Sequence, residues 1–326
     1  MAVAGFAVEG CFSPPEACHG CRAGLIDSSV DAPDAPGEAG TTDAPGAGGA
    51  TGAGGTTAGA GGKIDARADG AIGAGGATGI GGATGIGGAT GAGGAIDVDL
   101  VAWYRLDDVG GATAVDSSIN GRNAALTSLG GGSAAFSTAA QVGSGALNLM
   151  SSSATNGGFV TLPASLSTLG ASTAVTISCW VNVRTVRSWQ RIFDLGSNTT
   201  TYMFLTAHAT GLAVPNVPRF AITLTGNGPG AEETITMTTP APLSVGAWHH
   251  MAVVLGTGTP YTGTLYVDKV AVGANPGMTL RPSALGNGLN NWIGRSQFGD
   301  PLFDGLIDDF RIYRRPLTAA EIRALP

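Results

Sequence analysis

Short runs of alternating apolar and polar residues fill the chain from residue 98 to residue 326. The clearest run is residues 175–183, where the apolar positions alternate: Val175, Ile177, Cys179, Val181 and Val183. Such positions share one face of a β-strand, so the run predicts a strand with one buried side. Gly, Asn, Pro and Ser separate this run from its neighbours, as in strands joined by tight turns.

The other expected strands have the same character. They lie at residues 100–106, 159–162, 192–195, 202–205, 220–224, 234–237, 248–255, 264–267, 292–294 and 306–313. So many short strands, with no long helical period between them, indicate an all-β sandwich or barrel. One short helix is expected over residues 319–325, because Thr318 and Glu321 have the spacing of a capping box. Leu317 and Ile322 stand at the hydrophobic-staple positions around it.

A series of motifs follows in a fixed order along this region. The series is VAWYRLD at residues 101–107, DSSING at 116–121, ALNL at 146–149, TISCWV at 176–181, WHHMAV at 248–253, LYVD at 265–268, FDGLIDDFRIY at 303–313 and LTAAEI at 317–322. It resembles the laminin-G-like (concanavalin-A-like) jelly-roll domains of bacterial secreted proteins and lipoproteins. The resemblance implies an antiparallel two-sheet jelly-roll sandwich over residues 98–326. It implies no particular ligand, because this fold carries many functions. Lys269 departs from the family, which usually has glycine there.

The first 97 residues differ in composition and divide into two parts. Residues 1–27 form an N-terminal tail with three cysteines, and residues 28–97 form a low-complexity segment rich in Gly, Ala and Thr. The unit ATGIGG repeats at residues 77–82 and 83–88, which a β-helix of six-residue coils could use. Such a helix needs at least three coils with an apolar residue in each, so a disordered linker that lifts the domain off a surface is expected instead.

The three cysteines of the tail suggest an extracytoplasmic protein. Val8 to Cys11 resembles a lipoprotein lipobox except at Glu9, although residues 1–10 lack the basic start of a secretory signal. We expect lipidation at Cys11 if the true start lies upstream of Met1; the alternative is an ordinary cysteine. Cys18 and Cys21 are expected to form a disulfide in an oxidising compartment, because zinc would need two further ligands. The expected location is secreted or cell-surface, in a bacterial outer envelope.

Composition and charge exclude several partners. The net charge is −7 and Lys and Arg form no block, so nucleic acid is not an expected partner. No stretch approaches the ~18 consecutive apolar residues of a transmembrane helix. Membrane attachment is therefore expected only through an N-terminal lipid anchor, and the domain is expected to be monomeric.

Catalytic patterns are weak, and we expect no catalytic residue. Glu232 and Glu233 are adjacent, so on a strand they would face opposite ways and could not flank a glycosidic bond. The chain has neither a G-x-S-x-G nor an H-E-x-x-H motif. His249 and His250 lie in a strand that resembles a core element of the family, so structural roles are expected for them. A polysaccharide-acting glycosidase remains the alternative from the enzyme class.

The resemblance also implies a structural Ca²⁺ that ties the first strands to the last one. Asp116, Asn120 and Asp308 are then the expected ligands, with Asp107 as an addition, because Ca²⁺ takes six to eight oxygen ligands. The alternative is that Asp116 and Asn120 make turn hydrogen bonds, while Asp308 pairs with Arg311 or a backbone amide. Cys179 is expected to be a buried, unreactive thiol.

Two aromatic residues in polar loops are the candidates for ligand contact. Trp189 and Phe298 could stack against a sugar ring; each could equally anchor its loop to the sandwich. The sequence therefore favours a binding module for carbohydrate or glycoconjugate. A structural or adhesion module that contacts a surface protein is the rival interpretation.

Overall fold

The computed structural model describes residues 99–213, 215–288 and 290–326. The predictions for the tail (1–27) and the linker (28–97), with Cys11, Cys18 and Cys21, lie outside the described residues.

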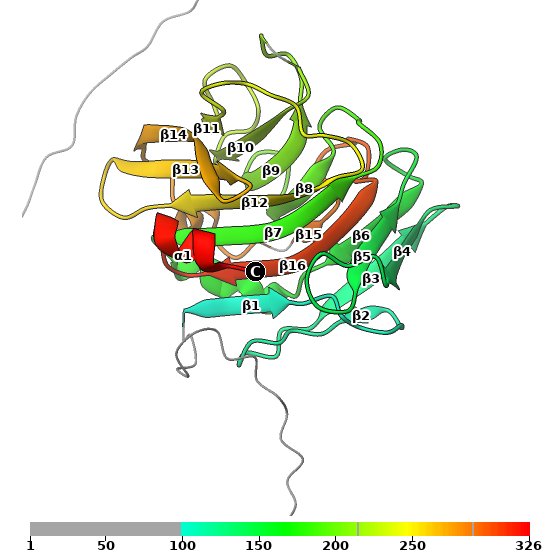
Figure 1. Ribbon diagram of the computed structural model, residues 1–326. Coiled ribbons are helices and arrows are strands. Elements are labelled where there is room, and N and C mark those ends of the chain that lie inside the picture. The colour runs from blue at the N-terminus through cyan, green and yellow to red at the C-terminus, as the bar shows by residue number, and fades with distance from the viewer. Residues whose placement is uncertain (1–98, 214, 289) are drawn as a thin grey trace, which may run out of the picture. The chain divides into compact units, whose positions relative to one another are not determined.

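Two antiparallel eight-stranded sheets pack face to face (Figure 1). The first sheet, sheet A, has the order β14 (Val270–Met278), β13 (Tyr261–Val267), β12 (Trp248–Leu255), β7 (Val175–Val183), β16 (Gly305–Tyr313), β5 (Ala146–Met150) and β4 (Ser133–Ser137), with β1 (Leu100–Tyr104) also paired to β16. The second sheet, sheet B, has the order β11 (Glu233–Thr236), β10 (Val217–Thr223), β9 (Tyr202–Ala209), β8 (Arg191–Gly196), β15 (Asn290–Ile293), β6 (Gly157–Thr161), β3 (Ala124–Leu129) and β2 (Thr113–Ala114). The predicted two-sheet jelly-roll sandwich is confirmed.

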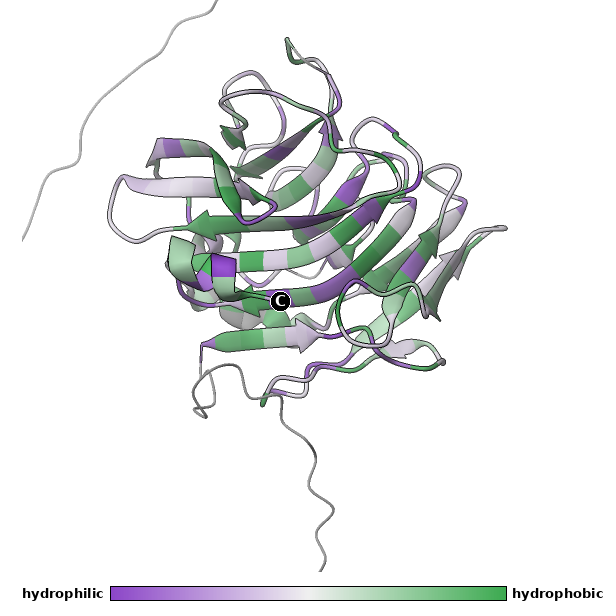
Figure 2. Cartoon of the chain, in the orientation of Figure 1, coloured by the Kyte–Doolittle hydropathy of each residue, from purple (hydrophilic) through white to green (hydrophobic). Residues whose placement is uncertain are grey.

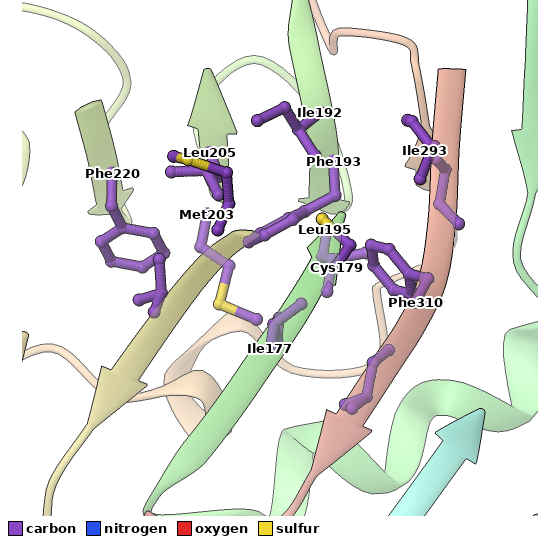
Figure 3. Close-up of a cluster of buried hydrophobic side chains, with 14 of the residues drawn as sticks. Ile177, Cys179, Ile192, Phe193, Leu195, Met203, Leu205, Phe220, Ile293 and Phe310 are labelled. Atoms are coloured by element: carbon purple, nitrogen blue, oxygen red, sulfur yellow. The ribbon is translucent and has the colours of Figure 1, made fainter. Parts of the chain in front are cut away.

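The hydrophobic core lies between the sheets and follows the alternation of each strand (Figure 2). Phe193 of sheet B and Phe310 of sheet A both lie in this layer (Figure 3), edge-on to each other with ring centroids 6.1 Å apart. Cys179 is 1% exposed in this layer, which confirms its predicted burial. Burial raises the pKa of the Cys179 thiol far above its usual range, so the reactive thiolate is disfavoured.

The sequence pattern located strands with a strong apolar face and missed those built from small residues. β7 and β12 begin and end where predicted. β2, β3, β4 and β14 were not predicted, because Ala, Ser, Thr and Gly carry little alternation in hydropathy. Two 3₁₀ segments, η1 (Ala164–Ala171) and η2 (Pro282–Leu285), were not predicted either.

The expected C-terminal helix is present as α1 (Ala319–Ala324), and its capping box is confirmed. The Thr318 hydroxyl accepts from the Glu321 amide at 3.2 Å, and the Glu321 carboxylate accepts from the Thr318 amide at 2.7 Å. Leu317 and Ile322 are buried against the outer face of sheet A, in a cluster with Tyr266 and Tyr313. Within the described residues, no helix is long and apolar enough to cross a membrane.

The hairpin between β13 and β14 tolerates lysine at the family's glycine position. Asp268 and Lys269 both have positive φ, 49° and 65°, as a tight two-residue hairpin turn requires. The Lys269 ammonium donates to the Leu325 carbonyl oxygen and lies 5.6 Å from the Trp180 ring centroid. These contacts offset part of the strain of a left-handed non-glycine residue.

Replacing the helix cap should destabilise the domain measurably. We expect Thr318→Ala to lower the free energy of unfolding by about 1 kcal/mol, because the Glu321 amide loses its acceptor. Thr318→Ser keeps the hydroxyl and should retain most of the stability. Urea unfolding followed by tryptophan fluorescence measures both variants, and an equal loss in the two would argue against the capping role.

Candidate functional site

A pocket of about 400 Å³ opens on the face of sheet B that points away from the core. On β9, Met203 and Leu205 enter the core, so the alternate residues Tyr202 and Phe204 face outward. The pocket is lined by Trp189, Arg191, Tyr202, Phe204, Arg219, Asn227, Gly228, Pro229, Gly230, Glu232, Phe298 and Asp300. Strands β8, β9 and β10 form its floor, and the loops around residues 189, 227–232 and 298–300 form its walls.

The structure brings the two sequence-predicted aromatic residues together in this pocket. Trp189 lies edge-on to Phe204, with ring centroids 6.5 Å apart, and Phe298 lies edge-on to Tyr202 at 5.5 Å. Tyr202 and Phe204 are buried, whereas Trp189 and Phe298 are only partly buried. Each predicted residue therefore anchors its loop on the sheet and also lines the pocket, so the two alternatives drawn from the sequence are compatible.

Trp189 is held in an uncommon backbone conformation. Its φ is 64°, in the left-handed region that costs a non-glycine residue about 1–2 kcal/mol. Its amide donates to the His208 carbonyl at 2.7 Å, and its own carbonyl accepts from Arg191 at 3.0 Å. Strained backbone of this kind gathers at binding sites, where the surrounding structure fixes a side chain in advance.

The guanidinium groups of Arg191 and Arg219 lie in the pocket, and each forms ion pairs with carboxylates. Arg191 lies 3.2 Å from Asp300 and 3.5 Å from Asp194, and its guanidinium carbon is 3.7 Å from the Phe204 ring centroid. Arg219 pairs with Glu232 at 2.6 Å. Glu232 also accepts from the Tyr202 hydroxyl at 2.7 Å. The pocket thus combines aromatic surface with hydrogen-bond donors and acceptors at almost balanced charge.

Asp194 lies under the pocket and fixes the loop that carries Phe298. Its side chain is fully buried, and it accepts from the Gln297 amide at 3.1 Å. Burial raises the pKa of Asp194 to about 7, although Arg191 opposes this shift. The Ser296 hydroxyl donates to Asp300 at 2.8 Å and accepts from the Phe298 amide at 3.0 Å. Sequence reasoning missed Asp194, whose only signal is a carboxylate inside the apolar run 192–195.

His249 joins Ser244 and Asp268 in a line that resembles a hydrolase triad. Its Nε2 lies 2.7 Å from the Ser244 Oγ and its Nδ1 lies 2.9 Å from the Asp268 Oδ2. Asp268 also accepts from the His250 amide at 3.0 Å, which ties the hairpin turn to β12. None of the three side chains lines the pocket on sheet B. The structural role expected for His249 stays a prediction.

The Asp116 carboxylate is fully used by its own loop and by β1. It accepts from the amides of Trp103, Ser118 and Arg122 at 2.7–2.9 Å and from the Ser118 hydroxyl at 2.8 Å. The Asn120 amide nitrogen donates to the carbonyls of residues 100 and 101. Both residues hold the turn, as the alternative reading of the sequence expected.

Asp308 is fully buried on β16 and serves a different loop. It accepts from the amides of Gln141 and Val142, each at 2.8 Å, while Arg311 pairs with Asp309 instead. Within the described residues, the second carboxylate oxygen of Asp308, Oδ1, has no hydrogen-bond partner. Asp107 accepts from the amides of residues 144 and 145.

The expected Ca²⁺ ligands do not form a calcium donor set in this arrangement. Among the described residues, no group of three or more His, Cys, Asp or Glu side chains is placed so that it could hold a metal ion. Because N–H and O–H donors point at both Asp116 oxygens, a cation there would have to displace them. The calcium site stays a prediction from the resemblance, without support from the donor geometry.

Comparison with known proteins places the sandwich among lectin-like domains. A family model described as the concanavalin A-like lectin/glucanases superfamily matches residues 153–323. Domain 4 of AbnA, a GH43 extracellular arabinanase from Geobacillus stearothermophilus solved in complex with arabinotriose, is similar with TM-score 0.52 and 20% identity, over 69% of this chain and 97% of that chain. At this identity the likeness shows the fold. No curated protein matches the sequence.

Two further solved structures are more distant. The binding domain of botulinum neurotoxin DC, in complex with rat synaptotagmin II, has TM-score 0.49 and 14% identity over 70% of this chain and 51% of that chain. The chain thus spans about half of that binding domain. The CBM40 of Ruminococcus gnavus IT-sialidase, bound to alpha2,3 sialyllactose, has TM-score 0.39 and 16% identity over 48% of this chain and 84% of that chain.

Asp194→Asn should change how stability depends on pH between about pH 4 and pH 7. With its pKa raised to about 7, the native protein holds one more proton at Asp194 than the unfolded chain over this range. This group therefore makes the wild type lose stability as pH rises, by up to about 1.4 kcal/mol per pH unit. The asparagine variant lacks this loss of stability, and its side-chain oxygen can still accept a hydrogen bond from the Gln297 amide.

The variant must be compared with the wild type at each pH. Burial lowers the pKa of His250 to about 4, which changes stability in the opposite sense over part of the same range. The difference between the free energies of unfolding of the two proteins, measured with urea at each pH, isolates the contribution of the Asp194 carboxyl group. Parallel curves for the two proteins would contradict the raised pKa of Asp194.

The geometry around Asp116 and Asp308 predicts the response to a chelator. We expect EDTA to leave the Tm of the protein unchanged, because protein donors already satisfy Asp116. Differential scanning fluorimetry with EDTA, and with CaCl₂ added back in excess, measures this directly. A fall in Tm that CaCl₂ but not MgCl₂ reverses would establish the calcium site instead.

Proposed function

The chain belongs to the concanavalin A-like lectin/glucanase superfamily, and on this premise we propose that residues 99–326 bind carbohydrate or glycoconjugate without catalysing a reaction. The observation that carries the proposal is the pocket on sheet B. It is concave, it has partly buried aromatic rings in its walls, and its polar groups converge on one space.

The chemistry of the pocket matches that of a sugar. A pyranose or furanose presents an apolar C–H face and a ring of hydroxyl groups that both donate and accept. Trp189 and Phe298 offer apolar surface for the first, while Arg219 and Glu232 offer a donor and an acceptor for the second. Similar folds support this assignment, because the arabinanase domain was solved with arabinotriose.

The pairing of the carboxylates supports the proposal that the site is not catalytic. A glycosidase uses one carboxyl group as an acid and a second as a base or nucleophile. In this pocket Glu232 is tied to Arg219 and Tyr202, and Asp300 is tied to Arg191 and Ser296. Paired carboxylates of this kind suit the recognition of hydroxyl groups better than proton transfer.

The proposed setting is outside the cell. A glycan-binding domain carried on a glycine-rich segment suits a secreted or cell-surface protein. Lipidation at Cys11, and with it attachment to a bacterial outer envelope, is part of this proposal and lies outside the described residues. Mass analysis of the mature N-terminus tests it.

A glycan array with the full chain should give a positive signal that depends on Trp189. We expect Trp189→Gly to weaken binding about tenfold or more, because the aromatic wall is lost while glycine suits the positive φ. Val186→Ala is the matched control, since Val186 is exposed in the same loop and does not line the pocket. Titration calorimetry with the array's best ligand gives the affinities.

The same samples test the rival functions. No glycan signal, together with a specific protein recovered by surface cross-linking, would favour the adhesion module. Release of reducing sugar from a polysaccharide panel, lost in Glu232→Gln, would overturn the proposal that the site is not catalytic.

A further inference from the structure

Trp292 lies beside the pocket on the same outer face of sheet B. In the strand register, Trp292 on β15 lies opposite Asp194 on β8, and Asp194 lies opposite Phe204 on β9. Opposite residues of paired strands point to the same face, and neighbouring strands lie about 4.8 Å apart. The Trp292 backbone therefore lies about 10 Å from that of Phe204 across the sheet, with one strand between them.

Arg295 rests on Trp292 and on a second aromatic ring from the next strand. Its guanidinium carbon lies 4.7 Å from the Trp292 ring centroid and 4.6 Å from that of Phe159. Phe159 belongs to β6, which pairs with β15, and it is 3% exposed. Two cation–π contacts from adjacent strands fix the position of the guanidinium, which remains partly exposed.

Arg295 differs from the pocket arginines in the partners available to it. Arg191 and Arg219 are each matched by carboxylates, whereas Arg295 makes neither a hydrogen bond nor an ion pair within the described part of the chain. The N–H donors of a guanidinium lie in its own plane, so contacts with ring faces do not use them. An arginine prepared in this way has the geometry that binds a carboxylate or sulfate through two parallel hydrogen bonds.

The charge of the sandwich does not oppose an anionic ligand. Residues 99–326 hold 13 Lys and Arg and 13 Asp and Glu side chains, so the net charge of −7 belongs wholly to residues 1–98. An anion that approaches sheet B therefore meets a domain of no net charge and, among the residues described on that face, the unmatched guanidinium of Arg295.

We propose that Arg295, carried on Trp292 and Phe159, is a second subsite, and that it binds the oxyanion of an acidic glycan. The oxyanion is the carboxylate of a uronic acid or a sulfate ester, and an adjacent sugar ring of the same chain occupies the pocket. The inference rests on the proposed glycan-binding function and adds the class of ligand. The pocket binds an uncharged sugar ring, because carboxylates already neutralise its own arginines. Arg295 binds the acidic group of the neighbouring sugar and so selects acidic glycans.

Two matched pairs of polysaccharides test the ligand class with the full chain. The first pair is polygalacturonate and its methyl ester, which differ in the carboxylate; the second is dextran sulfate and dextran, which differ in the sulfate. We expect affinity electrophoresis to show retardation by the acidic member of at least one pair and not by its neutral counterpart. The pair that responds identifies the oxyanion. Added NaCl should reduce the retardation, because salt screens a partly exposed ion pair.

Matched variants test the residue. Arg295→Gln should weaken binding of the acidic polysaccharide about tenfold. Arg295→Lys should retain part of the affinity, because lysine keeps the positive charge but lacks the planar, two-pronged donor geometry of a guanidinium. Arg323→Gln is the control, because it removes the same charge from an exposed position on α1, which packs on sheet A. The Tm of each variant is measured alongside, and Arg295→Lys decides the question if Arg295→Gln is unstable.

The outcomes separate this inference from the proposed function. Equal retardation by both members of each pair, no retardation at all, or equal losses in Arg295→Gln and Arg323→Gln would overturn the Arg295 subsite. If Trp189→Gly loses glycan binding while Arg295→Gln keeps it, the pocket stands and the subsite falls. If acidic binding depends on Arg295 but not on Trp189, the subsite stands and the pocket assignment falls.

Discussion

Phe193, Met203 and Leu205 of sheet B pack against Ile177, Cys179 and Phe310 of sheet A, and the rest of the molecule is arranged around this layer. Because side chains alternate along a strand, placing Met203 and Leu205 in the core places Tyr202 and Phe204 outside. A slip of one residue in the pairing of β9 would exchange the two sets. The pocket floor is therefore a consequence of core packing and needs no separate determinant.

The outer face of sheet B carries two kinds of arginine, those paired with carboxylates and one that is not. Arg191 and Arg219 are neutralised within the pocket and help to shape it, since each also lies near an aromatic ring. In the part of the chain that the structure describes, aromatic rings alone hold Arg295. Buried ion pairs add little net stability, so their value here lies in fixing geometry. In the subsite that we propose, this unmatched guanidinium discriminates between charged and neutral ligands.

Buried carboxylates serve as acceptors that join distant parts of the chain. Asp116 ties its loop to β1, Asp308 ties residues 141 and 142 to β16, and Asp194 ties the loop of Phe298 to β8. Each accepts backbone N–H groups that would otherwise lie buried without a partner, which costs about 1–3 kcal/mol per group. Asp116 and Asp308, which the family resemblance suggested as Ca²⁺ ligands, thus each hold a loop through backbone amides.

Hydrophobic alternation predicted an all-β sandwich or barrel with its strong strands, and the Thr318–Glu321 spacing predicted the capped helix, because both are local signals. The jelly roll followed from the resemblance of the motifs to a known family. The sequence also singled out Trp189 and Phe298 as aromatic residues in polar loops. These two residues lie far apart in the chain, and the folded arrangement of the sheets brings them into one pocket with Arg219 and Glu232. Strand order and register bring such residues together, and neither is encoded in the spacing of residues along the chain. For the same reason, no local pattern distinguishes Arg295 from the paired arginines, because the presence of a partner is a property of the folded neighbourhood.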